Sequence, residues 1–319
     1  MGSAFIRFLF EQTDFSGRVI NVDLLTYASS KRSLASCESS PRYTFYQANI
    51  HHQAFIEELL LNHEIDAVIH FAAETHVDRS IQHPEVFVDT NIRGTFTLLE
   101  CIRKYPHIHF HQISTDEVFG SLGEGGTFHE HTPYRPSSPY AASKAASDHL
   151  VSSYAKTYGL SITISHSVNN YGPFQHREKL IPCMLHKAFQ NKKLPLYGSG
   201  QQERSWIYVD DHAFALWTIL TKGEKGQAYG ICGTDIFTNL AVVKKILSTV
   251  LDVPENQLDE SAYISHIADR PGHDFRYALD GKKLHSLGYK PKIDFAEGLK
   301  KTISWYKKER YANTAFSGR

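Results

Sequence analysis

The chain has 319 residues, long enough to bury a large core and to form two domains or one large one. Basic and acidic residues number 34 each, so no overall field attracts nucleic acid or an anionic membrane. The four cysteines lack metal-ligand or disulfide-framework spacing, which favours a reducing cytosol and predicts no metal site. No apolar run approaches the roughly 18 residues of a membrane span, and no signal peptide is visible, so we expect a cytoplasmic protein.

The first half of the chain predicts alternating helices and strands. Phe5, Phe8 and Leu9 recur at helical spacing from the first turn onward. Strands are expected at 18–23, 43–46 and 108–113, and a buried strand, apolar on both faces, at 66–71. Residues 53–63 predict a short amphipathic helix, 76–80 a surface loop with paired charges as the alternative to supporting residues, and Pro84 opens a longer helix that reaches about residue 104. Further along, Asp210 and Asp211 predict an aspartate N-cap for a helix, and 296–308 predict a terminal amphipathic helix followed by a loose tail.

The stretch from Ser114 to Lys144 carries the residues best suited to acid–base chemistry. The expected strand at 108–113 delivers Thr115, Asp116 and Glu117 to its C-terminal end, where ligands bind in open α/β sheets. A helix beginning near Pro139 places Tyr140 and Lys144 four residues apart on one face. A tyrosine beside a lysine ammonium has its phenolate favoured, because an opposite charge stabilises the ionised form.

Three motifs carry a resemblance when they are taken together. They are Ser114-Thr-Asp-Glu-Val118, Tyr140-x-x-x-Lys144 and Asn169-Asn-Tyr-Gly-Pro173. Over almost the whole chain, from Gly2 to about Tyr306, the sequence resembles the nucleotide-sugar 4,6-dehydratases of the short-chain dehydrogenase/reductase superfamily, in particular those acting on dTDP-glucose. The resemblance implies an α/β fold: a Rossmann-type doubly wound parallel sheet with a smaller C-terminal substrate domain, and NAD as cofactor.

The start of the chain departs from that pattern. A Rossmann unit should open with a strand and a glycine-rich turn, and of that turn only Gly2 is present. A strand and most of a turn, on the order of ten residues, are therefore missing. We expect either that translation starts upstream or that the gene is truncated.

Several positions are expected to bind the cofactor. Asp23 ends a strand about 20 residues after Gly2, where a ribose-binding acid is expected, although a solvated aspartate closing a strand is the alternative. Asn49 and Ile50 stand where the family usually has Asp-Ile near the adenine; asparagine keeps an acceptor and adds a donor. By resemblance, the remaining cofactor positions are Ala72, Ala73, Asn91, Tyr140 and Lys144.

A second set of positions is expected to bind a nucleoside-diphosphate glucose. Arg204, Arg270 and His273 are cationic matches for a diphosphate, because guanidinium binds phosphate as a bidentate fork; a charged turn is the alternative for 269–274. Phe275 replaces an arginine that the family often has, which lowers the local positive charge. The other positions implied by the resemblance are His76, with Arg79 in support, Asn170, Glu178, Lys179, Leu180, Pro195, Tyr197 and Asn239.

The expected cofactor domain spans 1–168 plus about 206–238, and the substrate domain spans 169–205 plus about 239–319.

The resemblance implies a homodimer formed by the helix after Pro84 and the helix carrying Tyr140. It also implies a reaction. Tyr140, supported by Lys144, takes the C4 hydroxyl proton during oxidation by NAD, and Thr115 binds the same oxygen. Glu117 then removes the C5 proton, and Asp116 protonates the departing C6 hydroxyl. Two adjacent carboxyls with opposite duties need pKa values that are pushed apart.

Three alternatives stay open at this point. Sugar 4-epimerases and UDP-glucuronate decarboxylases share the Tyr and Lys but lack the Asp-Glu pair, so Asp116 and Glu117 favour a dehydratase. A dehydratase acting on UDP-glucose has the same motifs. A truncated remnant that is inactive or holds NAD weakly is the third alternative.

Overall fold

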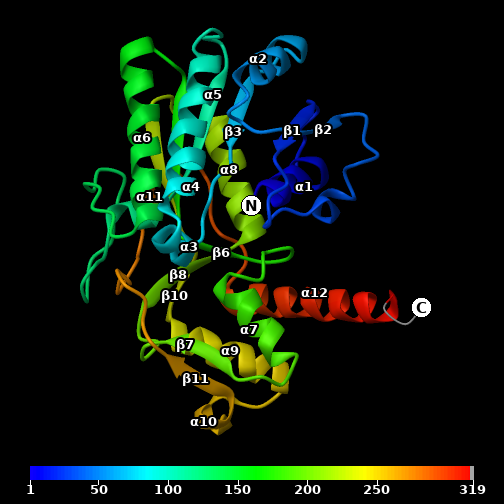
Figure 1. The fold of residues 1–319 in the computed structure, drawn as a ribbon, viewed down its shortest axis with the longest axis vertical. Helices are drawn as coiled ribbons and strands as arrows, with labels where there is room; N and C mark the ends of the chain where they lie inside the picture. Colours follow the sequence, from blue (N-terminus) through cyan, green and yellow to red (C-terminus); the bar gives the residue numbers. More distant parts are fainter. Residues whose placement is uncertain (317–319) are drawn as a thin grey trace.

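The computed structural model describes residues 1–316, with side chains described through Glu309. Figure 1 shows a larger part, with parallel strands between helices, and a smaller part below it. The last helix, α12 (Phe295–Phe316), projects to one side of the smaller part. It was expected over 296–308 and continues to Phe316, so the loose tail predicted for the last residues falls on 317–319, outside the described residues.

The larger part is built on four parallel strands in the order β3-β4-β5-β9. Their bounds are β3 Ala67–His70, β4 His109–Thr115, β5 Ile162–Ser167 and β9 Gln227–Ile231. Strands β4 and β5 are buried along almost their whole length, as expected for parallel strands covered on both faces. The α/β fold with a Rossmann-type parallel sheet is therefore confirmed, and its carboxyl edge is where Thr115 ends β4.

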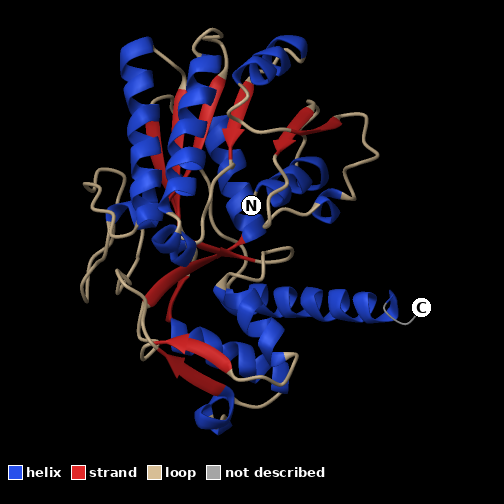
Figure 2. Cartoon of the chain, in the orientation of Figure 1, coloured by secondary structure: helices blue, strands red, loops and turns tan. Residues whose placement is uncertain are grey.

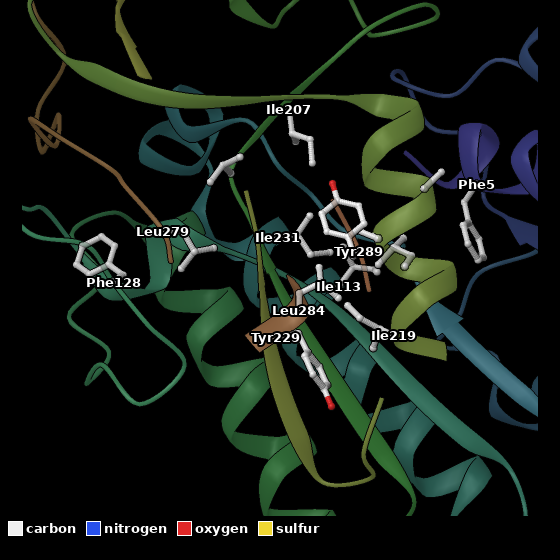
Figure 3. Packing of buried hydrophobic residues seen from close by; sticks show 14 of the residues in the cluster. Phe5, Ile113, Phe128, Ile207, Ile219, Tyr229, Ile231, Leu279, Leu284 and Tyr289 are labelled. Carbon is white, nitrogen blue, oxygen red and sulfur yellow. The ribbon is translucent and has the colours of Figure 1, made fainter. Parts of the chain in front are cut away.

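Helices cover both faces of this sheet. Phe110 and Ile113, three residues apart on β4, point to opposite faces. The Phe110 face packs against α2 (Gln53–Asn62), α5 (Gly94–Ile102) and α6 (Pro139–Tyr158). The Ile113 face packs against α1 (Gly2–Gln12), α8 (Val209–Lys222) and α11 (Lys282–Ser286), and Figure 3 shows Ile113 among Phe5, Ile219 and Leu284.

Strands β1 (Val19–Asp23) and β2 (Tyr43–Gln47) pair in parallel with each other and form a separate two-stranded sheet. Figure 2 shows these two strands set apart from β3. The prediction that the strand near 66–71 is buried on both faces is wrong: Ala67 is exposed, and Val68 and Ile69 are half-buried. The physical reason is that β3 pairs with β4 on one side and, in the described residues, with no strand on the other.

The helix expected from Pro84 onward is continuous but irregular. It consists of α4 (Pro84–Phe87), a π-helical turn η2 (Val88–Arg93) and α5, which ends at Ile102. A short helix α3 (Val77–Gln82), which sequence reasoning treated as a loop, precedes it. Because π turns occur mostly as single-turn insertions, often at functional sites, this one draws attention to Asn91 within it.

The smaller part has its own core. Its strands are β6 Asn169–Tyr171, β8 Glu203–Tyr208 and β10 Asp235–Thr238 in one sheet, and β7 Leu194–Tyr197 and β11 Ile264–Ile267 in another. Its helices are α7 Leu180–Ala188, α9 Asn239–Leu251 and α12. Buried residues from these elements, such as Leu185, Leu194 and Val243, form one cluster.

The chain returns to the larger part through α8 and β9, and the segment 277–289 packs into the core of that part as well. The expectation that an aspartate caps α8 is wrong: its N-cap is Tyr208, which makes no side-chain cap, and Asp210 and Asp211 lie in the first turn. Asp211 instead accepts from the backbone N–H of Ile293 at 2.9 Å. The remaining short elements are η1 Lys31–Leu34, η3 Asp116–Phe119, η4 Glu255–Gln257 and α10 Glu260–Tyr263.

Candidate active site

One cavity of about 1780 Å³ fills the break between β1 and β3 and extends past the carboxyl ends of these strands. Its lining includes the start of α1, every residue of β1, every residue of β3, and the loop from Asn170 to Lys179. Tyr140 and Lys144 from α6 also line it. The cavity therefore reaches both sides of the break between β1 and β3.

The adjacent carboxyls Asp116 and Glu117 begin η3 directly after β4. The Thr115 hydroxyl caps η3 by accepting from the Glu117 N–H at 3.3 Å, which fixes the turn. Asp116 is 1% exposed, and burial together with the neighbouring Glu117 charge raises its pKa to about 8. Burial also raises the pKa of Glu117, opposed by the charges of Arg270, Arg204 and Lys179. Asp116 is thus mostly protonated near neutral pH and can act as an acid.

Tyr140 and Lys144 lie one turn apart on α6, as the spacing predicted, and both are almost fully buried. The Lys144 ammonium donates to the Ile113 carbonyl at 2.7 Å. Burial raises the pKa of Tyr140, the Glu117 charge raises it further, and a hydrogen bond with Thr115 opposes the shift. The protein without its ligands therefore holds Tyr140 as a neutral phenol, in contrast to the phenolate expected from the sequence.

Most of the positions predicted for the cofactor lie together. Gly2, Asp23, Asn49, Ile50, Ala72 and Ala73 all line the cavity with Tyr140 and Lys144. Asp23 Oδ1 accepts from the Leu25 N–H at 2.6 Å and from the Ser29 hydroxyl at 2.9 Å. Asn49 Oδ1 likewise accepts from the His51 N–H at 3.0 Å. Each of these two side chains already shapes its own loop through one oxygen.

Asn91 is the predicted cofactor residue that the structure does not bring to the cavity. It is 1% exposed, and its amide is paired with both backbone groups of Glu74: it accepts from the N–H at 2.9 Å and donates to the carbonyl at 3.0 Å. It also donates to the Ser143 hydroxyl at 2.8 Å. Asn91 therefore ties the loop after β3 to the helix that carries Tyr140.

Strand β6 and the loop after it supply three predicted substrate residues to the cavity wall, Asn170, Glu178 and Lys179. The Asn170 amide donates to the Ser167 hydroxyl at 2.7 Å, while its buried Oδ1 has no partner. Lys179 donates to the Thr75 carbonyl at 2.7 Å, and burial lowers its pKa. This loop is thereby held against the turn that follows β3.

A second group of predicted substrate residues lies outside the cavity wall and links the two parts of the molecule. The Tyr197 hydroxyl donates to Asp78 at 3.0 Å, and Arg270 Nη1 lies 3.5 Å from the same carboxylate. His273 Nδ1 is 2.6 Å from Asp269 Oδ1. The Nε of Arg270 is buried and has no hydrogen-bond partner among the described residues.

Arg204 is 5% exposed, and its guanidinium is already engaged: Nη1 donates to the Glu203 carbonyl at 2.7 Å, and Nη2 to the Asp274 carbonyl at 2.8 Å. It also lies 4.2 Å over the Tyr277 ring. The other predicted positions are placed as follows: His76 caps α3 by accepting from the Arg79 N–H at 3.2 Å, Leu180 begins α7, Pro195 is on β7, and Asn239 begins α9.

Sequence reasoning missed Tyr27, Glu74 and Asp148 beside the site, although it singled out Arg79 and Glu178. Arg79 lies 3.8 Å over the Tyr27 ring, and the Tyr27 hydroxyl is 3.4 Å from both Glu74 and Glu178. Asp148, four residues after Lys144 on α6, is 1% exposed. Its spacing was a signal that could have found it, because residues four apart share a helix face.

In the part of the chain that the structure describes, no group of His, Cys, Asp and Glu could hold a metal ion. None of the described helices is both long and apolar enough to cross a membrane.

Comparison with known proteins gives a consistent result. The family model described as GDP-mannose 4,6 dehydratase matches residues 1–302. A dTDP-glucose 4,6-dehydratase of Haemophilus influenzae is 47% identical, with 96% of this chain and 94% of the relative covered. One from Escherichia coli K12 is 44% identical, with 96% and 90% covered.

The fold agrees with solved structures as well. The dTDP-glucose 4,6-dehydratase of Streptomyces venezuelae, solved with NAD bound, superposes with a TM-score of 0.91 at 41% identity, covering 98% of this chain and 95% of that one. The chain therefore belongs to the GDP-mannose 4,6 dehydratase family, in which the relatives compared here are dTDP-glucose 4,6-dehydratases.

Proposed function

We propose that this chain is a dTDP-glucose 4,6-dehydratase that uses NAD and yields dTDP-4-keto-6-deoxyglucose. The observation that carries the proposal is the set Thr115, Asp116, Glu117, Tyr140 and Lys144, gathered where β4 ends beside α6. The Asp116–Glu117 pair fits an elimination, which neither an epimerase nor a decarboxylase performs. Relatives at 44–47% identity carry this name.

The cavity suits a dinucleotide. The first turn of α1 lines it with backbone N–H groups, and the N-cap Met1 makes no side-chain hydrogen bond. The small side chains of Ala72 and Ala73 leave room beside it. Gly2, Asp23, Asn49, Ile50, Ala72 and Ala73 would hold NAD, with Tyr140 and Lys144 at its nicotinamide end. NAD supplies the hydride acceptor and donor of the cycle, so no net redox change occurs.

The residues divide the proton transfers among them. Tyr140 acts as the phenolate, which forms when the phenol releases its proton to solvent and is stabilised by the Lys144 ammonium; it then takes the C4 hydroxyl proton, and Thr115 bonds the same oxygen. Once C4 is a ketone, the C5 hydrogen is α to a carbonyl, and Glu117 removes it. Asp116, whose pKa of about 8 keeps it mostly protonated at neutral pH, gives its proton to the departing C6 hydroxyl. Asp116 can thus act as the acid and Glu117 as the base, because burial and mutual repulsion keep Asp116 protonated.

The sugar nucleotide would bind between the two parts of the molecule. Asn170, Glu178 and Lys179 line the cavity, and Arg270 keeps a buried Nε without a partner. His76, Leu180, Pro195, Tyr197, Arg204, Asn239 and His273 complete the proposed substrate contacts. Arg204 would act mainly through its charge, since two of its nitrogens already bond carbonyls.

The test is to incubate the enzyme, loaded with NAD, with dTDP-glucose in deuterated water, and with UDP-glucose as the comparison sugar. We expect the 4-keto-6-deoxy product, deuterium at C5, no accumulation of NADH, and a preference for dTDP-glucose. Glu117→Gln should still form bound NADH but lose C5 exchange. NADH accumulating in proportion to substrate would contradict the dehydratase, and normal C5 exchange in Glu117→Gln would contradict the assigned base. An inactive chain that leaves both sugars unchanged would favour the remnant.

The enzyme is further proposed to be a cytoplasmic homodimer. Val86, Val88 and Phe96 are 37%, 49% and 47% exposed along α4, η2 and α5, next to α6. Exposed apolar side chains gathered on adjacent helices suit a partner surface. All four cysteines are free thiols, which fits a reducing compartment. Light scattering should give a dimer for the wild type and a monomer for Phe96→Glu; a monomeric wild type at micromolar concentration would refute the dimer.

A further inference from the structure

A buried polar network lies behind the Tyr140–Lys144 pair. Asp148 follows Lys144 by four residues on α6, so the two side chains share a helix face. Asp148 Oδ2 accepts from the Ser114 hydroxyl and, at 3.2 Å, from the Tyr134 hydroxyl. His166 Nε2 lies 2.7 Å from the Tyr134 oxygen and 3.5 Å from Asp148 Oδ2. Asp148 and His166 are each 1% exposed.

The network connects three elements that form the site. Ser114 directly precedes Thr115 at the end of β4, His166 is on β5, and Asp148 belongs to the helix of Tyr140. Both hydroxyls donate to one carboxylate oxygen, which is the arrangement of an ionised acceptor, while Oδ1 has no partner. The Asp148 carboxyl is therefore held in place by two donors in a buried setting.

The buried Lys144 ammonium is stabilised by a nearby negative charge. It is 4% exposed, burial lowers its pKa, and Asp148 is the group that opposes this shift. The other groups around it do not replace that charge: His70 on β3 is held neutral by burial, with a pKa lowered to about 3, and Tyr140 and Tyr134 are neutral phenols. Asp116 and Glu117 follow β4, and Asp116 is mostly protonated near pH 7.

We infer that Asp148 is a positioning residue for the proposed reaction: held by Ser114, Tyr134 and His166, it supplies the counter-charge that keeps Lys144 an ammonium ion beside Tyr140. Lys144 can then donate hydrogen bonds and stabilise the oxygen anion that forms on Tyr140. This role rests on the proposed function only for its kinetic consequence, because the charge on Lys144 can be measured without any turnover.

The decisive variant is Asp148→Asn, which removes the charge and keeps the shape. The asparagine oxygen can still accept from Ser114 and Tyr134, so a purely structural role predicts little change. Lys144 is observed directly by NMR titration of ¹³Cε-labelled lysine in the full-length protein, with Lys144→Met to assign the signal. We expect the Lys144 pKa to fall by about one unit or more in Asp148→Asn, since nearby opposite charges shift pKa values by this order. An unchanged Lys144 pKa overturns the inference.

The kinetic readout is the pH profile of bound NADH formation in a single turnover with NAD and dTDP-glucose. Asp148→Asn should move the basic limb to lower pH by the same amount, because the rate falls once Lys144 loses its proton. Asp148→Glu, which keeps the charge, should restore the limb at least in part, and Tyr134→Phe, which removes one donor and no charge, should leave it within about 0.3 units. A loss of rate at every pH with an unmoved limb overturns the inference in favour of a structural role.

Two further measurements separate the possible failures. If Asp148→Asn does not fold, Asp148→Ser removes the same charge with a smaller side chain and carries the same prediction for Lys144. If neither sugar nucleotide reacts with the wild type, the proposed function fails, while the NMR titration of Lys144 still decides the role of Asp148.

Discussion

The two ends of the cavity are built differently, although both belong to the same Rossmann-type part. At the catalytic end, β4 and β5 are buried along nearly their whole length, and α6 is tied to them through Lys144 and Asp148. At the cofactor end, all five residues of β1 are half-buried, and within residues 1–316 β1 pairs only with β2. The catalytic end is a closed core of sheet and helices, whereas the cofactor end is open along the edge of β1.

The difference shows what positions each kind of residue. Tyr140, Asp116 and Thr115 are positioned by packing from several elements, and burial is the largest cause of the raised pKa values of Tyr140 and Asp116. Asp23 and Asn49 are instead oriented by local hydrogen bonds within their own loops. The cofactor end therefore depends on short-range turn chemistry, whereas the catalytic end depends on the sheet. Changes at one end should leave the other end largely unaffected.

The largest effect is expected for Tyr140→Phe. Removing the hydroxyl should lower the rate of C4 oxidation by about 10³-fold or more, because a positioned acid–base group contributes roughly 10²–10⁴-fold. Thermal stability should change little, since the ring still fills the buried site beside Phe87. NAD affinity should fall by about tenfold or less, because only one of the proposed NAD contacts loses a hydrogen bond, worth about 0.5–1.5 kcal/mol. Single-turnover NADH formation and NAD titration measure the two effects separately. A parallel loss of NAD affinity would contradict the independence of the two ends.

A segment that fills the break between β1 and β3 should act on the cofactor end alone. Appending a strand-forming sequence and a Gly-x-x-Gly turn before Met1 should strengthen NAD binding by about two to four orders of magnitude. Two charge-assisted hydrogen bonds from such a turn are worth roughly 1.5–3 kcal/mol each. Solubility should also rise, because unpaired strand edges promote association.

The control for this experiment is an extension of equal length in which both glycines are replaced by valine. It can still add a strand, but it cannot bring backbone N–H groups close to a pyrophosphate. Calorimetric titration of NAD into the three proteins decides the outcome. Equal affinities for the original chain and the glycine extension would show that a glycine turn adds nothing to cofactor binding here.

The same contrast explains what could be predicted from the sequence. The helix with Tyr140 and Lys144 and the strand expected at 108–113 follow from periodicity and spacing; the structure confirms both, with the strand extended to Thr115. The burial of β3 was wrong, because an apolar pattern cannot show whether a strand has two neighbours. The protonation of Tyr140 and the Asp148 network depend on burial and on contacts between residues far apart in the chain, which spacing does not reveal.

A matched pair of isoleucines tests how much each end contributes to stability. Ile164 on β5 is 4% exposed in a packed cluster, whereas Ile20 on β1 is half-buried. Ile164→Ala should cost about 4 kcal/mol in free energy of unfolding and Ile20→Ala about 1 kcal/mol, because the cost of a large-to-small change grows with the cavity it leaves. Urea unfolding of both variants gives the difference, about 3 kcal/mol. Equal costs would mean that β1 is as firmly packed as β5.

The smallest expected effect is a pH dependence of the free energy of unfolding that is caused by Asp116. Its pKa is about 8 in the folded protein and near its ordinary value in the unfolded chain. The folded state therefore holds an extra proton across this range. The carboxyl costs no stability below about pH 4, and its cost grows as pH rises until about pH 8. Asp116→Asn does not titrate, so its stability relative to the wild type should increase by about 2 kcal/mol between pH 6 and pH 8.

Urea unfolding of wild type and variant at the two pH values isolates this term, since every other titrating group is common to both proteins. A pH-independent difference for Asp116→Asn would mean that Asp116 is ionised at neutral pH. It could then no longer supply the proton for the departing hydroxyl, and the acid would have to be sought elsewhere at the catalytic end.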